Sequence, residues 1–501
     1  MESNLARLAE AALERSGDYP SLFYGDAWHS SVELHDRATR VARGLQARGV
    51  APGNRVVVIM ANCPEVLITY QALWRVGAVI TPVVFLATAP ELRHIIADSG
   101  AVAVITTAEL VDKVAAAQAG TGWPRPVYVV GANFAELEAA DPGSIVDRSP
   151  SDLAALLYTG GTTGRAKGVA LSHTNLSHAG KASRSVSHVE GVVRGITALP
   201  LSHSFGLLVT VGGLHTPEPV VSILQRWFEP NEWLRLAAEH RAQTTAVVPS
   251  MLAILIGAPL DDHDLGDLRF VFSGGAPLSV AVAAEFERRV PSAKVLEGYG
   301  CTETAGIISG TPPLAPRRGT VGKAVPGVEI RIVGPDGRDL PSGQDGEVVV
   351  CGPNVMSYYW DGEALPGGWF ATGDVGRLDE DGYLTIVDRL KDLILRGGFN
   401  VYPRDVEDAL MTHPAVAMAA VVGRPDSRLG EEVVGFVSLN AGAEVAEADL
   451  IAHARERLGA HKYPREVHIV DAVPLTSVGK LDRKRLRAAF TEGFDSSLSK
   501  P

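Results

Sequence analysis

Short apolar runs alternate with amphipathic helical patterns along the first part of the chain. The apolar runs occupy residues 55–60, 78–83, 102–106, 245–249 and 269–273, and helical spacing of apolar positions marks residues 65–76 and 90–99. Apolar runs of this length predict strands that are buried on both faces. Because strand–helix–strand repetition at this spacing pairs strands in parallel, the pattern predicts an α/β region in which helices cover a parallel sheet.

Closely spaced strands and turns replace this alternation between residues 319 and 387. Strand patterns at 328–333 and 346–351 flank the turn Pro335-Asp336-Gly337, which is typical of antiparallel strands joined by tight turns. We therefore expect this segment to form a small β-barrel or a twisted sheet.

A third pattern begins near residue 391. Strand patterns at 417–422 and 433–439 lie between helical patterns at 406–411 and 448–458, which predicts a small α+β domain. The charged segment 388–392 is the best candidate boundary. We expect an N-terminal domain of residues 1–390, made of parallel-sheet α/β subdomains and the small β-barrel, and a C-terminal domain of residues 391–501.

Composition narrows the class of protein. A chain of 501 residues is too long for one ordinary core, and 46% hydrophobic residues suffices for two or more domains. The net charge of −12 argues against nucleic acid or an anionic membrane as a partner, since both need a basic face. The three scattered cysteines, Cys63, Cys301 and Cys351, fit a reducing cytoplasm without a disulfide framework.

Neither end of the chain carries an address that we recognise. No apolar run is long enough to span a membrane, and the N-terminus has the pattern of an amphipathic helix rather than a signal peptide. We expect a cytoplasmic protein with no membrane span. The sequence leaves its oligomeric state open, with a homodimer among the options.

The segment 158–169 combines glycines, threonines and a lysine between strand patterns at 153–157 and 170–173. Glycines let a loop wrap closely around a ligand with its N–H groups pointing inward, and a lysine adds positive charge. Such a loop suits a nucleotide polyphosphate. It is not a Walker A loop, because Lys167 is followed by Gly168 and Val169 and no helical pattern starts there. The alternative interpretation is a flexible hairpin turn rich in small residues.

Two further segments combine carboxylates with glycines and hydroxyls. Residues 297–303 end in Thr302 and Glu303, where an acidic residue beside hydroxyls suits Mg²⁺. The same pattern also fits an ordinary helix N-cap followed by an acidic first turn. Asp374, at the end of the segment 368–374, can accept both hydroxyls of a ribose or lie in an ordinary glycine-rich turn.

The last two segments are 388–403 and 474–483. The second contains Lys480, which follows a glycine in an expected tight turn. The alternative interpretation is an ordinary surface charge, since most exposed lysines are solvated. In this order the five segments resemble the adenylate-forming superfamily, which includes acyl-CoA synthetases, firefly luciferase and the adenylation domains of nonribosomal peptide synthetases. The resemblance covers nearly the whole chain. The first segment departs from the family pattern at two positions. The family often has a serine where this chain has Gly160, and a proline where it has Ala166.

The resemblance implies a two-step reaction. An ATP-dependent acid–CoA ligase activates a carboxylic acid as acyl-AMP and releases pyrophosphate, and then transfers the acyl group to CoA and releases AMP. ATP, Mg²⁺ and coenzyme A are therefore the expected cofactors and co-substrates. The resemblance also implies that the C-terminal domain is mobile and rotates between the two steps.

Residue roles follow from the same resemblance. It assigns catalysis to Lys480, Glu303, Thr302 and His203, the metal ion to Glu303, the hinge to Lys391, and the CoA tunnel to Arg396, Gly397 and Gly398. The residues expected to bind ATP or AMP, with Asp374 and Arg389 as the ribose-binding pair, are Thr159, Gly160, Gly161, Thr162, Thr163, Gly164, Lys167, Gly275, Ala276, Pro277, Glu297, Gly298, Tyr299, Gly300, Thr302, Asp374, Arg389 and Lys480. The residues expected to form the acyl pocket are His203, Phe205, Gly206, Ser250, Met251, Gly274, Gly275, Gly300 and Ile307.

The substrate acid is only partly defined. Residues 201–208 contain no acidic side chain, which argues against an amino acid, because its buried ammonium would lack a partner. The apolar lining favours a hydrophobic acid, whether fatty, aryl or polycyclic. His203 either gates the carboxylate or packs as a neutral core histidine, and Arg396 either reaches the 3′-phosphate of CoA or is a surface charge.

Two alternatives to the acid–CoA ligase stay open. An acyl-adenylate ligase would instead load the thiol of a carrier protein acting in trans. A non-catalytic binder would hold nucleotide or acyl-adenylate without turnover. The presence of Glu303, Asp374, Arg389 and Lys480 argues against the binder, which has no need of the last of these.

Overall fold

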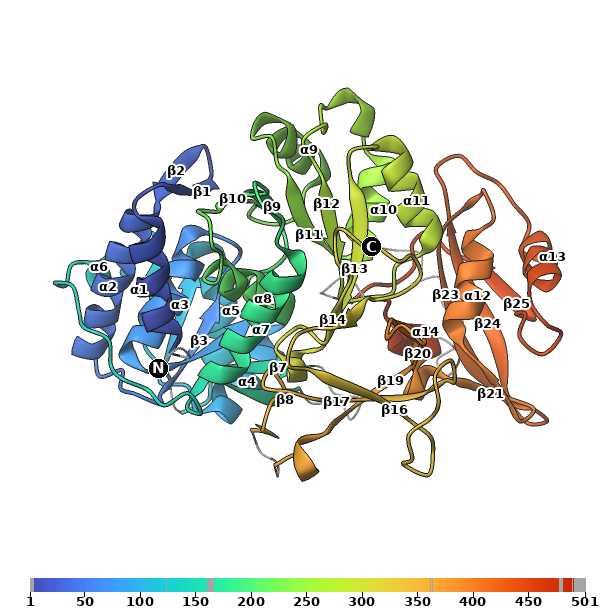
Figure 1. Cartoon of the computed structure of the whole chain (residues 1–501). Helices are drawn as coiled ribbons and strands as arrows, with labels where there is room; N and C mark the ends of the chain where they lie inside the picture. The colour runs from blue at the N-terminus through green and yellow to red at the C-terminus, as the bar shows by residue number, and fades with distance from the viewer. Residues whose placement is uncertain are drawn as a thin grey trace.

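The computed structural model describes residues 4–122, 124–159, 166–360, 362, 364–476, 481–488 and 490. Figure 1 shows an N-terminal α/β unit in blue, a second α/β unit in green, a small sheet in yellow to orange and a C-terminal α+β unit in orange to red. The predicted mixed α/β class is confirmed. Within the described ranges, no helix is long and apolar enough to cross a membrane.

A seven-stranded sheet in the order β18-β8-β7-β4-β3-β5-β6 forms the N-terminal unit. Its strands are β3 Arg55–Ile59, β4 Val79–Val83, β5 Ala103–Thr107, β6 Val127–Val130, β7 Leu153–Thr159, β8 Lys167–Ser172 and β18 Tyr358–Tyr359. The helices of this part are α1 Leu5–Ser16, α2 Ser31–Ala47, α3 Pro64–Val76, α4 Ala89–Ser99, α5 Val111–Gln118 and α6 Ala135–Glu138. Strands β3 to β7 pair in parallel, whereas β8 and β18 are antiparallel additions. Val57 and Val58 point to opposite faces and are each at most 1% exposed, so the apolar run is buried on both sides as predicted.

A nine-stranded sheet in the order β15-β14-β13-β12-β11-β9-β10-β1-β2 forms the second unit. Its strands are β1 Pro20–Tyr24, β2 Ala27–Ser30, β9 Arg194–Thr197, β10 Val221–Leu224, β11 Thr244–Val247, β12 Phe270–Ser273, β13 Lys294–Tyr299, β14 Ser309–Gly310 and β15 Lys323–Ala324. The helices are α7 His173–Ser187, α8 Ser204–Gly213, α9 Pro230–Glu239, α10 Pro249–Gly257 and α11 Val280–Arg289. Strands β9 to β13 are parallel, so their carboxyl ends meet at one edge, where ligands bind in open α/β sheets.

The segment expected to form a small β-barrel is an open antiparallel sheet instead. It contains β16 Glu329–Val333, β17 Gly346–Cys351, β19 Phe370–Leu378 and β20 Leu384–Arg389, in that order. The outer edge of β20 is occupied, because Leu384 N donates to Gly322 O at 2.8 Å and Val321 N donates to Leu384 O at 2.8 Å. The edge of β16 is occupied as well, since Leu340 N donates to Ile332 O at 2.8 Å. Four strands whose outer edges bond other segments do not close on one another.

The C-terminal unit has a core and a sheet of its own. The sheet has the order β22-β21-β24-β23 with β25 beside β24 and contains β21 Ile394–Arg396, β22 Phe399–Val401, β23 Val416–Asp426, β24 Gly430–Leu439 and β25 Glu466–Ile469. The helices are α12 Pro403–Met411, α13 Glu447–Arg457 and α14 Arg483–Ala488. The short 3₁₀ helices of the whole molecule are η1 Ala108–Leu110, η2 Leu260–Asp262, η3 Thr302–Thr304, η4 Pro366–Gly368 and η5 Leu390–Asp392. The expected domain boundary at 390/391 falls between the sheet that ends with β20 and the sheet that begins with β21; the division into two domains stays a prediction.

Candidate active site

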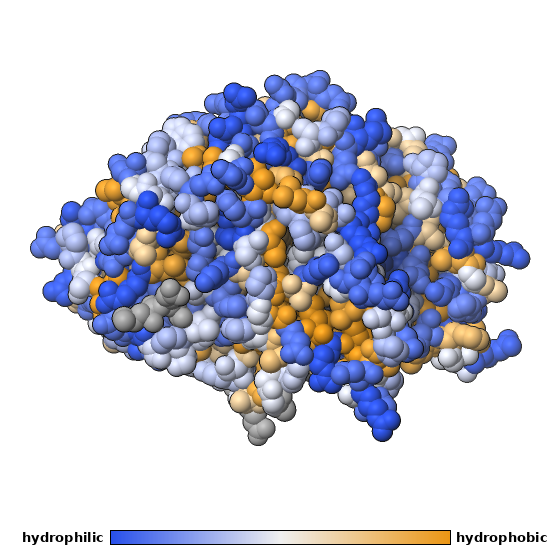
Figure 2. All heavy atoms as spheres, in the orientation of Figure 1, coloured by the Kyte–Doolittle hydropathy of each residue, from blue (hydrophilic) through white to orange (hydrophobic). Residues whose placement is uncertain are grey.

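A cavity of about 1730 Å³ collects most of the predicted site residues. Its walls come from the carboxyl ends of β12 and β13, the start of α8, β18, the β19–β20 pair, and α12 and α14 of the C-terminal unit. The predicted residues that line it are Thr159, Lys167, His203, Phe205, Ser250, Gly274, Gly275, Ala276, Pro277, Glu297, Gly298, Tyr299, Gly300, Thr302, Glu303, Ile307, Asp374, Arg389 and Lys391. On the face drawn in Figure 2, apolar side chains gather at the centre of the molecule, between the elements drawn green and orange in Figure 1.

The predicted phosphate loop connects two antiparallel strands. Residues 160–164 of the loop lie outside the described residues, as does Lys480. Thr159 and Lys167 face each other as partners in the β7–β8 register, so the loop leaves and re-enters the sheet at one point. The ammonium of Lys167 lies 5.5 Å from the ring centre of Tyr359, which brings this lysine to the wall that carries Glu303.

Glu303 is fixed at the cavity wall by a residue that the sequence did not reveal. It lies in η3, and Tyr359 of β18 donates a hydrogen bond from its hydroxyl to Glu303 Oε1 at 3.0 Å. Burial, together with the charge of Glu303, raises the pKa of Tyr359 and keeps it a donor. β18 reaches this place by pairing with β8, where Tyr359 stands opposite Val169. Only the aromatic run 358–360 marks the position in the sequence.

The predicted ribose-binding pair comes together across two strands. Asp374 of β19 and Arg389 of β20 are register partners, and Arg389 Nε lies 3.2 Å from Asp374 Oδ1. The hydroxyl of Tyr299 donates to Asp374 Oδ2 at 2.6 Å, and burial followed by the charge of Asp374 raises the pKa of Tyr299. Asp374 is 8% exposed, with the hydrogen bond from Tyr299 on one carboxylate oxygen and the ion pair with Arg389 on the other. It is therefore held rigidly at the wall with lone pairs left for further donors.

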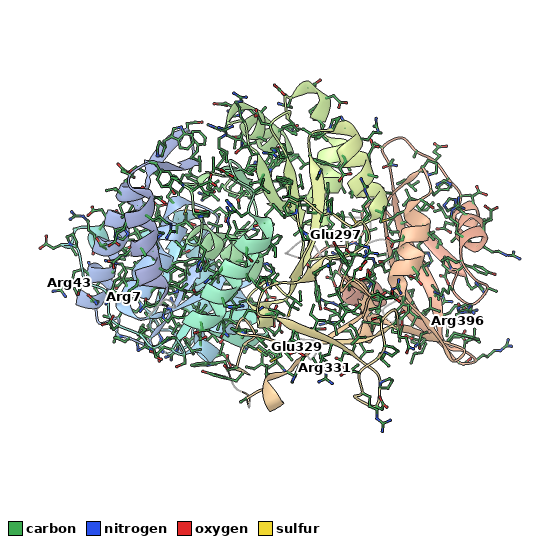
Figure 3. All side chains as sticks on the ribbon, in the orientation of Figure 1. Arg7, Arg43, Glu297, Glu329, Arg331 and Arg396 are labelled. Carbon is green, nitrogen blue, oxygen red and sulfur yellow. The ribbon has the colours of Figure 1, made fainter. Side chains whose placement is uncertain are left out.

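Glu297 faces the C-terminal unit from the end of β13, near the centre of the molecule in Figure 3. Burial raises its pKa to about 7, Arg404 opposes that shift and Asp408 adds to it. Arg404 stands at the start of α12 and donates from its guanidinium to the carbonyls of Ile386 at 2.9 Å and Leu278 at 3.3 Å. No pattern in the sequence marks this arginine, which ties the C-terminal unit to the rest of the molecule.

The residues predicted for the acyl pocket separate into two groups. His203 caps α8, since its Nδ1 accepts from Phe205 N at 3.3 Å, and it is half-buried at the cavity wall rather than packed in a core. Gly206 and Met251 do not line the cavity. Met251 is 6% exposed within the second hydrophobic core. A Cβ on Gly206 would lie 2.2 Å from the carbonyl oxygen of Pro200, so this glycine permits α8 to pack closely there.

The predicted CoA-tunnel residues lie away from the cavity. Arg396 in β21 pairs with Glu432, with 2.5 Å between Arg396 Nε and Glu432 Oε1, and the two side chains are 13% and 11% exposed. Gly397 and Gly398 form the turn after β21 with φ of 58° and 83°. Figure 3 shows Arg396 at the outer end of the C-terminal unit, far from Glu297. This arrangement therefore does not bring the three residues to the cavity, and Arg396 is an ion-paired side chain.

Lys391 lies in η5, at the junction of the two units, and lines the cavity. Burial is the largest cause that lowers its pKa, and the charge of Arg389 adds to the effect. The predicted hinge residue is thus placed between the ribose-binding pair and the C-terminal sheet.

Comparisons with known proteins identify the family of the chain. Residues 8–360 match the model of the AMP-binding enzyme family, and residues 405–480 match the AMP-binding enzyme C-terminal domain. The chain is 36% identical to a feruloyl-CoA synthase of Amycolatopsis sp over 92% of this chain and 93% of that one. It is 34% identical to the fatty acid–[acyl-carrier-protein] ligase ScoC of Streptomyces coeruleorubidus over 91% of each chain.

Solved structures extend the likeness to the fold. ATP-bound MatB from Rhodopseudomonas palustris is 33% identical and superposes with a TM-score of 0.88 over 98% of this chain and 100% of that one. Apo MatB from the same organism, at 32% identity and 99% and 100% coverage, gives a TM-score of 0.80. The chain therefore belongs to the AMP-binding enzyme family, within the adenylate-forming superfamily that includes the acyl-CoA synthetases.

Proposed function

We propose that this chain is an ATP-dependent acid–CoA ligase. It would join a carboxylic acid with an apolar body to the α-phosphorus of ATP, release pyrophosphate, and then pass the acyl group to the thiol of CoA with release of AMP. The observation that carries the proposal is the single cavity that holds Glu303, Asp374 and Arg389 together with the acyl-facing wall at Phe205. Its volume of about 1730 Å³ exceeds that of a site for one small molecule, roughly 300–1000 Å³, and leaves room for nucleotide and acid together.

The first step joins two anions, so positioning and positive charge would do most of the catalytic work. Asp374 would accept the ribose hydroxyls, and Lys167 together with the loop 160–164 would hold the phosphates. Lys480, by the resemblance, would neutralise charge on the α-phosphate. No enzyme nucleophile is required, because the acid itself attacks phosphorus.

Glu303 fits the expected Mg²⁺. Among the described residues no cluster of three or more metal-ligating side chains occurs, so a cation here would rely on one carboxylate with phosphate oxygens and water. Tyr359 holds that carboxylate in one orientation. When bound, Mg²⁺ would supply positive charge to the triphosphate.

The arrangement of the two units suits the first step. The higher TM-score against ATP-bound than against apo MatB supports this assignment. For the second step, the C-terminal unit would rotate about Lys391 and bring Arg396, Gly397 and Gly398 to the thiol tunnel. The resemblance to the family supports this motion.

The decisive experiment is incubation of the protein with ATP, Mg²⁺, CoA and a panel of fatty, aryl and polycyclic acids, with products read by mass spectrometry. A thioester mass is the expected result and names the substrate class. Absence of both acyl-AMP and thioester across the panel would contradict the ligase and favour the non-catalytic binder.

A carrier-protein thiol is the second candidate acceptor. The likeness to a fatty acid–[acyl-carrier-protein] ligase favours it. Acyl-AMP that accumulates with CoA present, and is consumed when a phosphopantetheinylated carrier protein is added, would establish this acceptor.

A further inference from the structure

Arg184 is an unusual residue for the wall of a cavity that takes a hydrophobic acid. It lies in the last turn of α7 and lines the cavity. Between residues 183 and 272, a stretch described throughout, it is the only permanently charged side chain of the lining, and no acidic side chain lines that stretch. A negative group at this wall would therefore meet one positive charge and no acidic side chain of the same stretch of lining, with Glu218 acting on the arginine from outside the lining.

The guanidinium of Arg184 has few partners within the protein. Nη2 lies 3.4 Å from Nδ1 of His188, while Nε is buried and has no hydrogen-bond partner in the described part of the chain. No described carboxylate lies within 4.0 Å of this guanidinium. Burial lowers the pKa of Arg184, and the charge of Glu218 opposes that shift only from a distance. A half-buried cation whose buried Nε donor is unused is costly unless an anion joins it.

An ordinary helix-terminal role does not account for these contacts. An arginine in the last turn of a helix stabilises the helix by bonding its terminal carbonyls. Arg184 makes no such bond among the described residues, and its stem runs beside α8 toward the cavity, where a Cβ on Gly212 would lie 3.7 Å from Arg184 Cγ. The side chain is directed along the cavity wall instead.

The wall around Arg184 suits an acid that is apolar in the middle and polar at its end. Leu208 and Val209 of α8 supply apolar lining, whereas Ser183 and Ser187 of α7 add hydroxyls on either side of the arginine. Hydroxyls and a guanidinium together form a good receptor for a carboxylate, which accepts several hydrogen bonds.

Helix α8 extends from the predicted reaction centre to the wall that carries Arg184, so its length gives the distance between them. At its start, Ser204 Oγ lies 3.4 Å from Oγ1 of Thr302, the predicted catalytic threonine. At its end, Gly212 lies beside Arg184. Gly212 follows Ser204 by eight positions along the helix, a rise of roughly 12 Å. A substrate that reaches from one end to the other must be much longer than a two- or three-carbon diacid.

Resting on the proposed ligase function, we propose that Arg184 binds a second, non-reacting carboxylate of the substrate. The substrate class is then a long dicarboxylic acid whose two carboxylates are separated by an aliphatic or aromatic spacer. The carboxylate beside Thr302 forms acyl-AMP with loss of pyrophosphate and then a thioester with loss of AMP. The carboxylate at Arg184 stays free in the product.

Matched acids test this inference. We would measure kcat/KM for 4-carboxycinnamic against cinnamic acid, and for octanedioic against octanoic acid, in the wild type, Arg184→Met, Arg184→Lys and Lys181→Met. The Lys181 variant removes an exposed charge from the same helix outside the cavity lining. Arg184→Met is expected to lower kcat/KM for the dicarboxylic member of each pair by roughly 10- to 100-fold and for the neutral member by less than about threefold. Arg184→Lys should restore part of the loss and Lys181→Met should change neither value.

The outcomes separate the inference from the function on which it rests. If neutral acids are turned over and Arg184→Met lowers kcat/KM equally for both members of a pair, the role of Arg184 is overturned. The ligase function would be unaffected by that result. Absence of acyl-AMP and thioester with every acid would remove the ligase. Calorimetric binding of 4-carboxycinnamate would then decide the Arg184 contact without turnover, because binding that is equal in the wild type and Arg184→Met overturns it and weaker binding to the variant supports it.

Discussion

Tyr359 and Glu303 show how one hydrogen bond can orient a predicted catalytic group. The hydroxyl of Tyr359 fixes the Glu303 carboxylate while the Tyr359 ring lies under the ammonium of Lys167. Tyr359→Phe keeps the ring and removes the hydroxyl, so we expect kcat/KM for ATP to fall roughly 10-fold, with a shift to higher Mg²⁺ requirement. Pyrophosphate release measured against Mg²⁺ concentration checks this. Tyr358→Phe is the control, because Tyr358 is the neighbour of Tyr359 in β18 and does not line the cavity. Equal effects of the two variants would contradict the assignment.

Lys480 carries a prediction that rests on the resemblance to the family. Lys480→Ala should lower acyl-AMP formation by orders of magnitude, because its ammonium would offset charge at the α-phosphate. Conversion of preformed acyl-AMP to thioester should stay largely intact. Single-turnover assays of each half-reaction measure the two effects, with Arg485→Ala, an exposed position in α14, as the control. Equal loss in both half-reactions would refute the division of labour.

Glu297 makes the stability of the folded protein depend on pH, and the direction of that dependence follows from its raised pKa. Burial raises its pKa from 4.5 to about 7, so between these values the folded state retains a proton that the unfolded state has lost. Stability therefore falls as pH rises through this window. Glu297→Gln removes the titrating group and should stabilise the protein at pH 8 by up to about 3 kcal/mol. Unfolding curves between pH 5 and 9 test this, with Glu444→Gln at an exposed position as the control. If the difference in unfolding free energy between wild type and Glu297→Gln is the same across this pH range, the raised pKa is disproved.

At the scale of the elements, α8 has no room for a larger residue at Gly206, because its start touches the backbone of residues 200–201. A Cβ on Gly206 would lie 2.2 Å from Pro200 O and 2.8 Å from Leu201 Cα, so Gly206→Ala must displace the helix. We expect a loss of about 1–3 kcal/mol in unfolding free energy and a higher KM for the acid, since His203 and Phe205 move with the helix. Gly257→Ala is the control, because nothing lies within 4 Å of its added Cβ. Thermal unfolding and acid titrations give the two readouts, and a silent Gly206→Ala would show that α8 shifts freely.

Elements with a strong local pattern were predictable from the sequence, and contacts between distant segments were not. The run 55–60 predicted β3 because every side chain after Arg55 is apolar and the strand is buried on both faces. The open form of the sheet made of β16, β17, β19 and β20 depends instead on Val321 and Gly322, which bond Leu384 from more than sixty residues away in the sequence. A barrel and an open sheet have the same alternation of apolar residues, so the local pattern could not distinguish them.

The candidate site likewise contains residues that the sequence predicted and residues that only the structure revealed. Asp374 and Arg389 were predicted because each stands in a recognisable segment, and the register of β19 and β20 joins them. Tyr359 and Arg184 are residues of ordinary type at unremarkable places in the sequence, and they acquire a role only where β18 and α7 meet the cavity. Met251 was assigned to the acyl pocket from its segment, yet its side chain points into the second core.

At the scale of the whole molecule, Arg404 connects the C-terminal unit to the rest of the chain. Its backbone N–H donates to Asp388 Oδ2 at 3.0 Å, and its guanidinium holds the carbonyls of Ile386 and Leu278. Leu278 belongs to the second α/β unit, so one side chain spans both sides of the junction. The pair Arg483–Glu407 lies within the C-terminal unit and joins α14 to α12.

Replacing Arg404 should therefore change the balance between two arrangements of the units. Arg404→Met removes the guanidinium bonds to Ile386 and Leu278 but leaves the backbone bond to Asp388, so we expect acyl-AMP formation to slow roughly 10-fold while thioester formation from preformed acyl-AMP is unchanged or faster. Amides of β12 and α12 should exchange hydrogen faster in the variant. Arg428→Met, an exposed position in the β23–β24 turn, controls for loss of charge. Equal slowing of both half-reactions would show that Arg404 supports folding of the site, because a residue that stabilises only one arrangement must favour one step at the expense of the other.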